Sequence, residues 1–176
     1  MKNIIFLLTL VILVSCKSNK ELNISVPYND NVILLGPANN DGFEQEPYNE
    51  WFNPNYQDYK VDKSAIEELS SLSKDIQIVT FMGTWCGDSK REVPAFLKIL
   101  DSIGFKSKKH KIYAVSRKKT TPEQAELGLN ITNVPTFIFY KDGQELNRIV
   151  EYPIESLEKD MLNILKGNDY KHAYAE

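Results

Sequence analysis

The sequence predicts an α/β fold in which a mixed central β-sheet is flanked by helices on both faces. From about residue 62 to residue 166, hydrophobic positions alternate between the spacing of amphipathic helices and short apolar runs typical of buried strands. The patterns follow one another as helix, strand, helix, strand, helix, strand, strand, helix. An Asp-Gly turn joins the last two strands, which makes them antiparallel, whereas helices separate the earlier strands. One sheet therefore contains both kinds of strand pairing.

Length and composition limit the classes of function. The chain has 176 residues, of which 42% are hydrophobic and 26% charged, as expected for one globular domain with a modest extension. A net charge of -3 argues against broad nucleic-acid binding, which needs a basic face to neutralise phosphates. Two cysteines and two histidines cannot build a disulfide scaffold or a four-ligand zinc site. No phosphate-binding loop or serine triad is visible, so we expect neither a metal nor a cofactor.

The first half of the predicted domain contains two helices and a strand. Ser64-Ala65-Ile66-Glu67 has the pattern of a capping box for the first helix. Residues 76–81 form a short β-branched run typical of a buried strand. Cys86 lies at the start of the next helix, in which Pro94 should produce a kink. The apolar face of this helix comprises Val93, Phe96, Leu97, Leu100 and Ile103.

The second half adds the remaining strands and helices. Residues 112–115 form a strand, and Thr121-Pro122-Glu123-Gln124 resembles the capped start of a brief helix. Residues 136–140 form a strand, and residues 145–150 return antiparallel to it after Asp142-Gly143. A last helix has an inner stripe that consists of Ile154, Leu157, Met161, Leu162 and Leu165.

A polar, turn-rich segment precedes this domain. Its prolines and the Asn-Asn-Asp-Gly at 39–42 argue against helices, and residues 32–35 are the only strand that we predict there. Its first dozen residues have the composition of a linker. The later part is rich in aromatic residues, so we expect it to pack onto the domain; an exposed partner-binding surface is the alternative. We therefore predict an extension at 16–61, the domain at 62–166 and a tail at 167–176.

The first fifteen residues have the pattern of a signal peptide. Residues 4–14 are apolar except for Thr9, and as a helix they would span only about half of the hydrocarbon core of a membrane. They lead into Leu13-Val14-Ser15-Cys16, which resembles the lipobox of bacterial lipoproteins. This resemblance implies cleavage before Cys16 and acylation of that cysteine by fatty acids such as palmitate. An ordinary secretory signal is the alternative.

The lipobox implies a location as well as a modification. We expect the protein to be anchored by lipid to a membrane of the bacterial cell envelope. The residues that follow Cys16 contain no acidic cluster, which favours a position that faces the periplasm.

Cys86 is the candidate nucleophile. It follows a predicted buried strand and lies at the first turn of a helix, where unpaired backbone N–H groups stabilise an anion. Gly83 and Gly87 on either side make the turn accessible. A buried, inert cysteine is the alternative.

Four motifs around this cysteine resemble the thioredoxin family. The segment Trp85-Cys86-Gly87-Asp88-Ser89-Lys90 resembles the family's active-site sequence W-C-G-P-C-K. Pro94 matches its helix-kinking proline, Val134-Pro135-Thr136 its cis-proline loop, and residues 137–145 the hairpin that follows. Together with the lipobox, these motifs resemble the membrane-anchored, TlpA-like members of the family. The resemblance implies a thioredoxin-like fold over about residues 62 to 166.

The resemblance also implies roles for individual residues. Cys86 would be the catalytic thiol, and Trp85 would shield one side of it. Pro135, in cis, would face the thiol, and a proline there supplies no N–H. The backbone of Val134, with Thr136 after it, would then bind an extended substrate segment.

Two departures from the family pattern change the expected chemistry. Ser89 stands where the family has its resolving cysteine, so Cys86 can form a mixed disulfide but cannot close an internal one. Ser89 could still donate a hydrogen bond to the Cys86 thiolate. Thr80 stands where the family has a buried acid, and Asp88, close to the thiol, should face solvent. Turnover would then require an external reducing thiol.

These observations predict a thiol–disulfide oxidoreductase or isomerase that acts through one cysteine on envelope proteins with cysteines or disulfides. The alternative is a non-catalytic binding module that uses the cis-proline groove and the aromatic segment 43–59. Two basic runs, 106–111 with His110 and 117–119, are expected to be solvated loops rather than a patch for an anionic partner.

Overall fold

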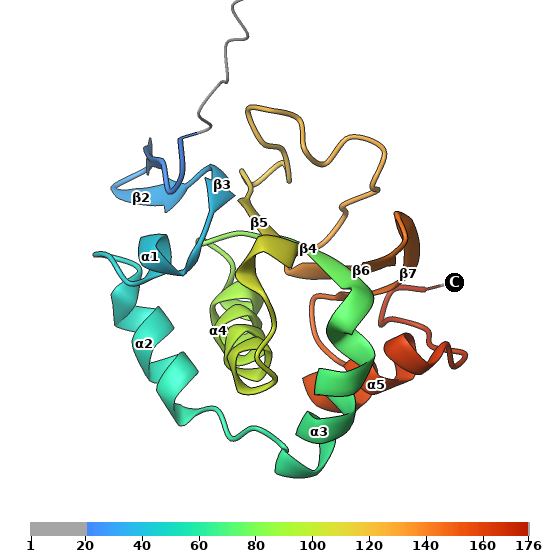
Figure 1. Ribbon diagram of the computed structural model, residues 1–176. Helices are drawn as coiled ribbons and strands as arrows, with labels where there is room; N and C mark the ends of the chain where they lie inside the picture. Colours follow the sequence, from blue (N-terminus) through green and yellow to red (C-terminus); the bar gives the residue numbers. More distant parts are fainter. Residues whose placement is uncertain (1–20, 176) are drawn as a thin grey trace, which may run out of the picture.

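The computed structural model describes residues 21–175, so the predicted signal peptide and Cys16 lie outside the described residues. It confirms the predicted fold class: a five-stranded mixed sheet is flanked by helices (Figure 1). The strands lie side by side in the order β3-β5-β4-β6-β7. Their bounds are Gly36–Ala38 (β3), Ile76–Met82 (β4), His110–Ala114 (β5), Thr136–Lys141 (β6) and Gln144–Val150 (β7).

The central strand β4 fixes the register of the sheet. It pairs in parallel with β5 and antiparallel with β6, so that Thr80 lies opposite Ile112 on one side and Phe137 on the other. The β6–β7 hairpin turns at Asp142 and Gly143, whose φ angles are 51° and 79°. These left-handed values match the right-handed twist of a tight hairpin. The strands and the turn predicted for this hairpin are confirmed.

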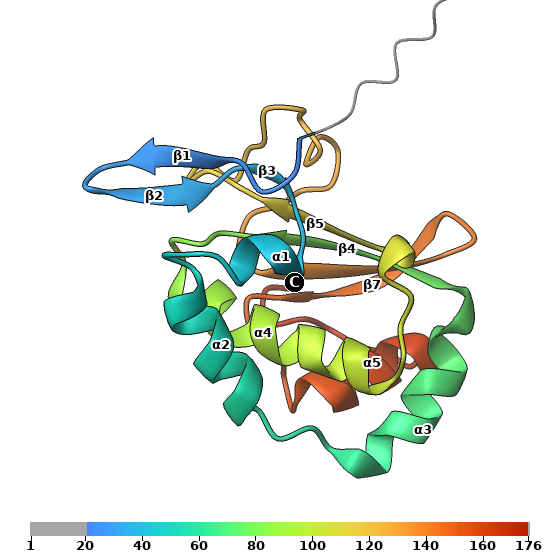
Figure 2. The ribbon, with the colours of Figure 1, turned by 60° about the vertical axis from the view of Figure 1, so that its left-hand side comes forward.

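The α-helices gather at one side of the sheet (Figure 2), where each of the five contributes to one hydrophobic cluster. The helix α4 begins directly after β4, and α2 packs along it, whereas α3 packs along α5. The helices span Asn40–Phe43 (α1), Asn49–Asp58 (α2), Lys63–Leu72 (α3), Gly87–Ser102 (α4) and Leu157–Lys166 (α5). Two short 3₁₀ turns, η1 at Ser73–Asp75 and η2 at Ser107–Lys109, lead into β4 and β5.

The larger hydrophobic core lies between these helices and the sheet. Phe96 of α4 is at its centre: its ring stacks on that of Phe137 at 4.2 Å and meets that of Phe139 edge-on at 6.1 Å. Because side chains alternate along a strand, Phe81 and Ile138 point to the other face, where they form a second, smaller cluster. Residues 116–133 cover this second cluster without a helix, so the helices predicted on both faces of the sheet pack on one face only.

The helix predicted to begin at Thr121 does not form. The Thr121 hydroxyl accepts a hydrogen bond from the Ala125 N–H (2.9 Å) and donates one to the Glu126 carboxylate (2.8 Å). Gln124 takes a left-handed backbone conformation, with φ of 57°. The capping residues that favour a helix start instead close a hydrogen-bonded turn, because the Glu126 side chain occupies the Thr121 N–H and hydroxyl.

The segment before residue 62 is structured, which corrects the prediction of a single strand and no helix. Strands β1 (Ser25–Tyr28) and β2 (Asn31–Leu34) form a hairpin, and β3 adds an edge strand to the main sheet. Helix α2 forms even though Pro54 lies inside it. Phe43 and Phe52 are almost completely buried, as expected for an aromatic segment that packs onto the domain. This burial outweighs the local cost of the proline.

Two helix boundaries also differ from the prediction. Asp62, and not Ser64, caps α3: its carboxylate accepts hydrogen bonds from the Ser64 N–H (2.9 Å) and hydroxyl (2.6 Å). Ser156 caps α5, which leaves Ile154 outside the helix and 53% exposed. In both cases the residue nearest the true start of the helix provides the capping oxygen.

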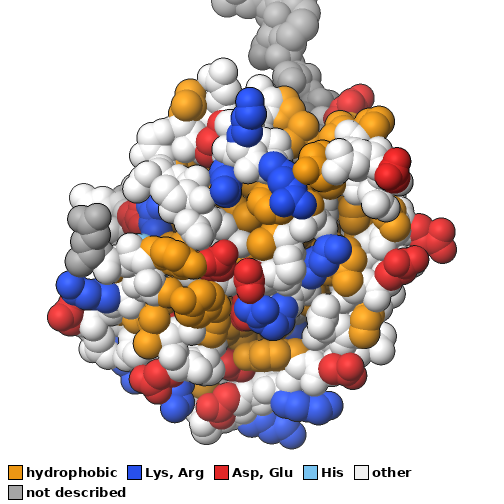
Figure 3. Space-filling model, turned by 180° about the vertical axis from the view of Figure 1, so that it is seen from behind, with side chains coloured by type: hydrophobic (Ala, Val, Ile, Leu, Met, Phe, Trp, Pro, Cys, Tyr) orange, Lys and Arg blue, Asp and Glu red, His pale blue; other side chains and the backbone are white. Residues whose placement is uncertain are grey.

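On the face opposite to that of Figure 1, acidic and basic side chains are interspersed, with hydrophobic side chains exposed between them (Figure 3). That face has no continuous basic surface of the kind that binds nucleic-acid backbones.

Phe96→Ala should lower the free energy of unfolding by about 4 kcal/mol, because it removes a buried ring stacked on other rings and leaves a cavity. Chemical denaturation monitored by circular dichroism measures this change. Leu127→Ala is the control, since Leu127 is 67% exposed and its truncation should leave stability almost unchanged. A loss below about 1 kcal/mol for Phe96→Ala would contradict this description of the core.

Candidate functional site

Cys86 lies at the junction between β4 and α4. It is the N-cap residue of α4; its N–H donates to the Gly83 carbonyl (2.9 Å), and its carbonyl accepts from the Lys90 N–H (3.0 Å). The thiol is partly exposed and is the only cysteine in the described part of the chain. It donates a hydrogen bond to the carbonyl oxygen of Val134 at 3.2 Å. The chain therefore places an accessible sulfur at the start of a sixteen-residue helix, beside the loop that ends at β6.

The loop that faces the thiol has the expected cis proline. The peptide bond between Val134 and Pro135 is cis, which confirms the geometry implied by the family resemblance. Two hydrogen bonds hold the loop: the Thr136 hydroxyl donates to the Asn133 carbonyl (2.7 Å), and the Glu151 N–H donates to the Pro135 carbonyl (2.7 Å). The Val134 carbonyl is thereby fixed beside the sulfur.

Trp85 covers one side of the site. Its indole N–H donates to the Val115 carbonyl (2.8 Å), which ties the ring to the end of β5. A Cβ atom at position 83 would lie 2.5 Å from the indole ring, so only a glycine fits beneath it. The guanidinium of Arg117 lies 4.9 Å from the ring centroid on the exposed side. The tryptophan is held on several sides and forms a wall next to Cys86.

Ser89 does not take the role that the sequence predicted for it. The expected hydrogen bond to the Cys86 thiolate is not formed; instead the Ser89 hydroxyl accepts one from the Gly83 N–H at 3.1 Å. Ser89 is completely buried, because the first turn of α4 directs it toward the end of β4. It therefore braces the active-site turn from inside and satisfies a buried N–H.

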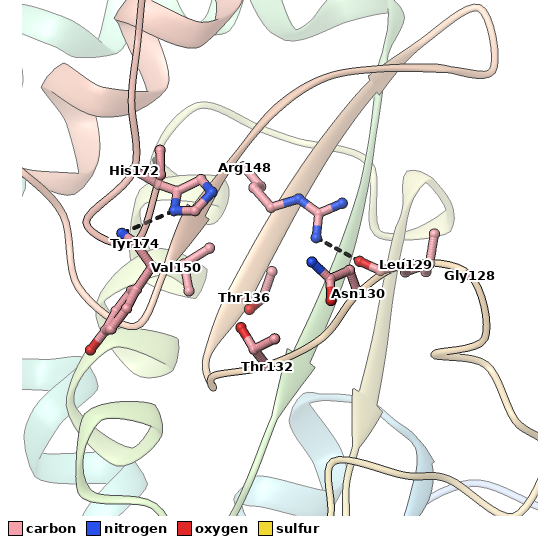
Figure 4. Close-up of a pocket in the computed structure, with 10 residues that line it drawn as sticks. Gly128, Leu129, Asn130, Thr132, Thr136, Arg148, Val150, His172 and Tyr174 are labelled. Atoms are coloured by element: carbon pink, nitrogen blue, oxygen red, sulfur yellow. Dashed lines mark hydrogen bonds between the residues drawn. The ribbon is translucent and has the colours of Figure 1, made fainter.

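Thr136, predicted to bind substrate, lies at the rim of a different cavity. This cavity of about 640 Å³ is formed by the loop before β6, by β7 and by the C-terminal tail (Figure 4). Thr136 is buried, and its hydroxyl is already bonded to Asn133. Arg148, the cation of this cavity, is engaged by both oxygens of Glu145 and by the Leu129 carbonyl. Cys86 does not line it, so the chemistry of the thiol is not performed there.

The position of the family's buried acid contains Thr80, as the sequence shows, and the structure pairs it with His110. The Thr80 hydroxyl and His110 Nε2 share a hydrogen bond of 2.8 Å, and the imidazole packs edge-on against Phe96. His110 thus belongs to the core side of β5, which corrects its prediction as part of a solvated loop. Burial lowers the pKa of His110 to about 3, so the ring is neutral at physiological pH.

The charged side chains on the first turns of α4 lie outside the reaction centre. Asp88 is partly exposed, as predicted, and forms an ion pair with Arg91 at 2.7 Å. Arg91 also bonds Glu92, whose pKa is raised by burial. One guanidinium thus pairs with two carboxylates, of which Asp88 is partly exposed and Glu92 is buried.

Sequence reasoning missed the contribution of the N-terminal hairpin to the site. The Leu34 N–H donates to the Thr84 hydroxyl (3.1 Å), which ties β2 to the residue before Trp85. The Arg117 guanidinium also lies over the ring of Tyr28, 5.6 Å from its centroid. The basic run at 117–119 marks Arg117 in the sequence, but no local pattern predicts that Arg117 contacts Tyr28.

Within residues 21–175, no group of three or more His, Cys, Asp or Glu side chains is arranged to hold a metal ion. Over the same residues, no helix is both long enough and apolar enough to cross a membrane.

Comparison with known proteins identifies the family of this chain. A family model of thioredoxins matches residues 42–164. The chain belongs to the thioredoxin family. It is 37% identical over 93 residues to a thioredoxin of Aspergillus fumigatus, covering 53% of this chain and 77% of that protein. A thioredoxin of Mycobacterium tuberculosis is 33% identical over 90 residues, covering 51% of this chain and 72% of that protein.

A solved structure shows the same fold in a more distant protein. A protein of unknown function from Pseudomonas aeruginosa superposes with a TM-score of 0.54 at 14% sequence identity, covering 70% of this chain and 86% of that one. The thioredoxin family supports thiol–disulfide chemistry for this chain, and Cys86 is the described thiol that can perform it.

His110, half-buried on the core side of β5, should make the stability of this thioredoxin-family protein depend on pH. Between pH 6.5 and about 3 the unfolded chain protonates His110 and the folded chain does not, so stability falls as the pH falls through this window. Between pH 6.5 and 4 the free energy of unfolding should fall by about 2 kcal/mol less in His110→Gln than in the wild type. Denaturant unfolding at several pH values measures it.

His172→Gln, in the tail, is the matched control. It should change the pH dependence of the free energy of unfolding much less, because burial lowers the pKa of His172 less than that of His110. An unchanged slope in His110→Gln would mean that His110 titrates equally in both states.

Proposed function

We propose that this protein is a thiol–disulfide oxidoreductase that acts on protein partners through a single nucleophile, Cys86. The observation that carries the proposal is the position of the sulfur, partly exposed at the N-cap of α4 and 3.2 Å from the Val134 carbonyl of the cis-proline loop. The helix N-terminus stabilises the thiolate that attacks. The cis-proline loop presents backbone groups beside the sulfur, where an extended partner segment can pair with them.

The reaction proceeds by two kinds of exchange. The Cys86 thiolate attacks one sulfur of the partner's disulfide; that S–S bond breaks, and the other partner sulfur leaves as a thiolate that takes up a proton. An external thiolate then attacks the Cys86 sulfur, releases the partner's second thiolate and stays joined to Cys86. A second external thiol restores Cys86 and leaves as an oxidised disulfide. Ser89 has no sulfur and cannot replace these external thiols.

The test of this function is the reduction of insulin disulfides by glutathione. The wild-type protein should accelerate the reaction, and Cys86→Ala should abolish the acceleration while the fold is retained. Equal rates for the two proteins would reject the catalytic proposal and leave a binding role.

Ser89→Cys should convert the site into one that closes an internal disulfide, because residue 89 lies in the first turn of α4 one turn after Cys86. After mild oxidation, intact mass should fall by two hydrogens and thiol titration should find no free thiol at these positions. Ser89→Ala is the matched control, which removes the hydroxyl and adds no sulfur. Two free thiols in the oxidised Ser89→Cys protein would contradict the inferred geometry.

We further propose that the protein is a TlpA-like lipoprotein anchored through Cys16 and directed toward the periplasm. The support is the apolar run at 4–14 followed by Leu13-Val14-Ser15-Cys16. Cys16→Ser should move the protein from the membrane fraction to the soluble fraction of the cells, because it removes the sulfur that would be acylated. Membrane fractionation with Cys86→Ser as control measures this, and unchanged membrane association of Cys16→Ser would contradict the anchor.

A purely binding role has weaker support. Such a role would use the aromatic segment 43–59 as a partner surface. In the structure Phe52 stacks on both Phe43 and Tyr56, so these rings contact one another. The first two of these rings are buried, so the segment offers a partner only its remaining edges.

A further inference from the structure

The N-terminal hairpin forms a pocket beside the active-site tryptophan. This cavity of about 360 Å³, here called the hairpin pocket, lies between β1–β2, the start of α2 and the active-site turn. The hairpin at residues 25–34 precedes the segment that the thioredoxin family model matches, 42–164. The side chains that the argument uses are Tyr28, Glu50, Trp51, Trp85, Lys90 and Arg117. The pocket is therefore an addition to the family's site.

The hairpin is fixed in place by hydrogen bonds to the domain. Besides the Leu34–Thr84 bond, the hydroxyls of Ser25 and Tyr48 are 3.0 Å apart. At the base of the hairpin, Asn23 Oδ1 accepts from the Asn39 N–H at 2.9 Å. These contacts hold one wall of the pocket relative to Trp85, so the pocket does not have to be ordered by a ligand.

The pocket carries two cations without an ionic partner. The Arg117 guanidinium carbon lies 4.9 Å from the ring centroid of Trp85 and 5.6 Å from that of Tyr28, and the Lys90 ammonium lies 5.9 Å from the ring centroid of Trp51. Among the described residues neither of the two cations forms an ion pair. Glu50 is the one carboxylate that lines the pocket, which leaves an excess of one positive charge. Contacts with aromatic rings do not use the N–H donors of a guanidinium, which therefore remain for a ligand.

We propose that the hairpin pocket binds an acidic side chain of the protein partner, a few residues from the cysteine that Cys86 attacks. This inference rests on the proposed function. The pocket begins at Trp85, the residue next to Cys86, and an extended chain advances about 3.3 Å per residue. A partner segment that lies along the cis-proline loop would therefore bring an Asp or Glu close to its reacting cysteine within reach of the N–H groups of the Arg117 guanidinium. A carboxylate there gains charge-assisted hydrogen bonds from a planar guanidinium.

The test uses short peptides that contain one cysteine joined by a disulfide to 2-thiopyridine. Attack by Cys86 on the peptide sulfur expels 2-thiopyridone, whose absorbance gives the rate. Three peptides carry Asp, Asn or Lys near the cysteine. The wild-type protein should react about fivefold faster with the Asp peptide than with the Lys peptide at low salt, and the ratio should approach one at high salt.

Arg117→Gln should abolish this preference, which is read as the ratio of the Asp-peptide rate to the Lys-peptide rate within the variant, so that any general change in reactivity cancels. Lys118→Gln, which removes an adjacent exposed charge outside the pocket, is the matched control and should keep most of the preference. If all peptides react equally with the wild type, or if the two variants lose the preference equally, the pocket does not recognise the acidic group. If the folded wild type reacts with no peptide, the proposed function fails together with this inference.

Discussion

The site depends on the junction at which β4 ends and α4 begins. At this point the chain must leave a buried strand, present a thiol at a helix N-terminus and make room for an indole ring. Gly83 makes room for the indole ring of Trp85, and its N–H donates to the Ser89 hydroxyl inside the turn. The Cys86 thiol then meets the Val134 carbonyl from the opposite loop. The contacts of Gly83 fix the turn that carries the sulfur, the Val134 carbonyl meets the sulfur itself, and the cores on both faces of the sheet hold the junction in place.

The departure from a dithiol site has a structural consequence as well as a chemical one. In place of a second sulfur, Ser89 provides an oxygen that accepts a hydrogen bond inside the protein. The position is completely buried, so its side chain acts on the turn and not on a partner. Thr80 and His110 likewise form a neutral pair where the family has an acid. The interior of this site therefore holds the nucleophile in place and supplies no internal reductant.

The sequence predicted the parts of the molecule that local patterns determine. The strand before Cys86, the helix after it, the cis-proline loop and the hairpin at Asp142 and Gly143 all have short-range signals. The missed features depend on distant partners. The helix α2 forms around Pro54 because its aromatic side chains pack against the domain, and His110 is half-buried because Phe96 lies against it. The role of Arg117 required Tyr28, a residue 89 positions earlier in the chain, as its second ring.

The central claim is that the fold makes Cys86 a better nucleophile than the same residue in an unfolded chain. Its most direct test is the second-order rate of mixed-disulfide formation with a small uncharged disulfide, measured by intact mass at mildly acidic pH. The rate of the native protein is compared with that of the protein unfolded in guanidinium chloride. The account predicts a rate about tenfold or more higher in the native protein, because only there does the helix N-terminus stabilise the thiolate. A native rate equal to or below the unfolded rate would contradict it.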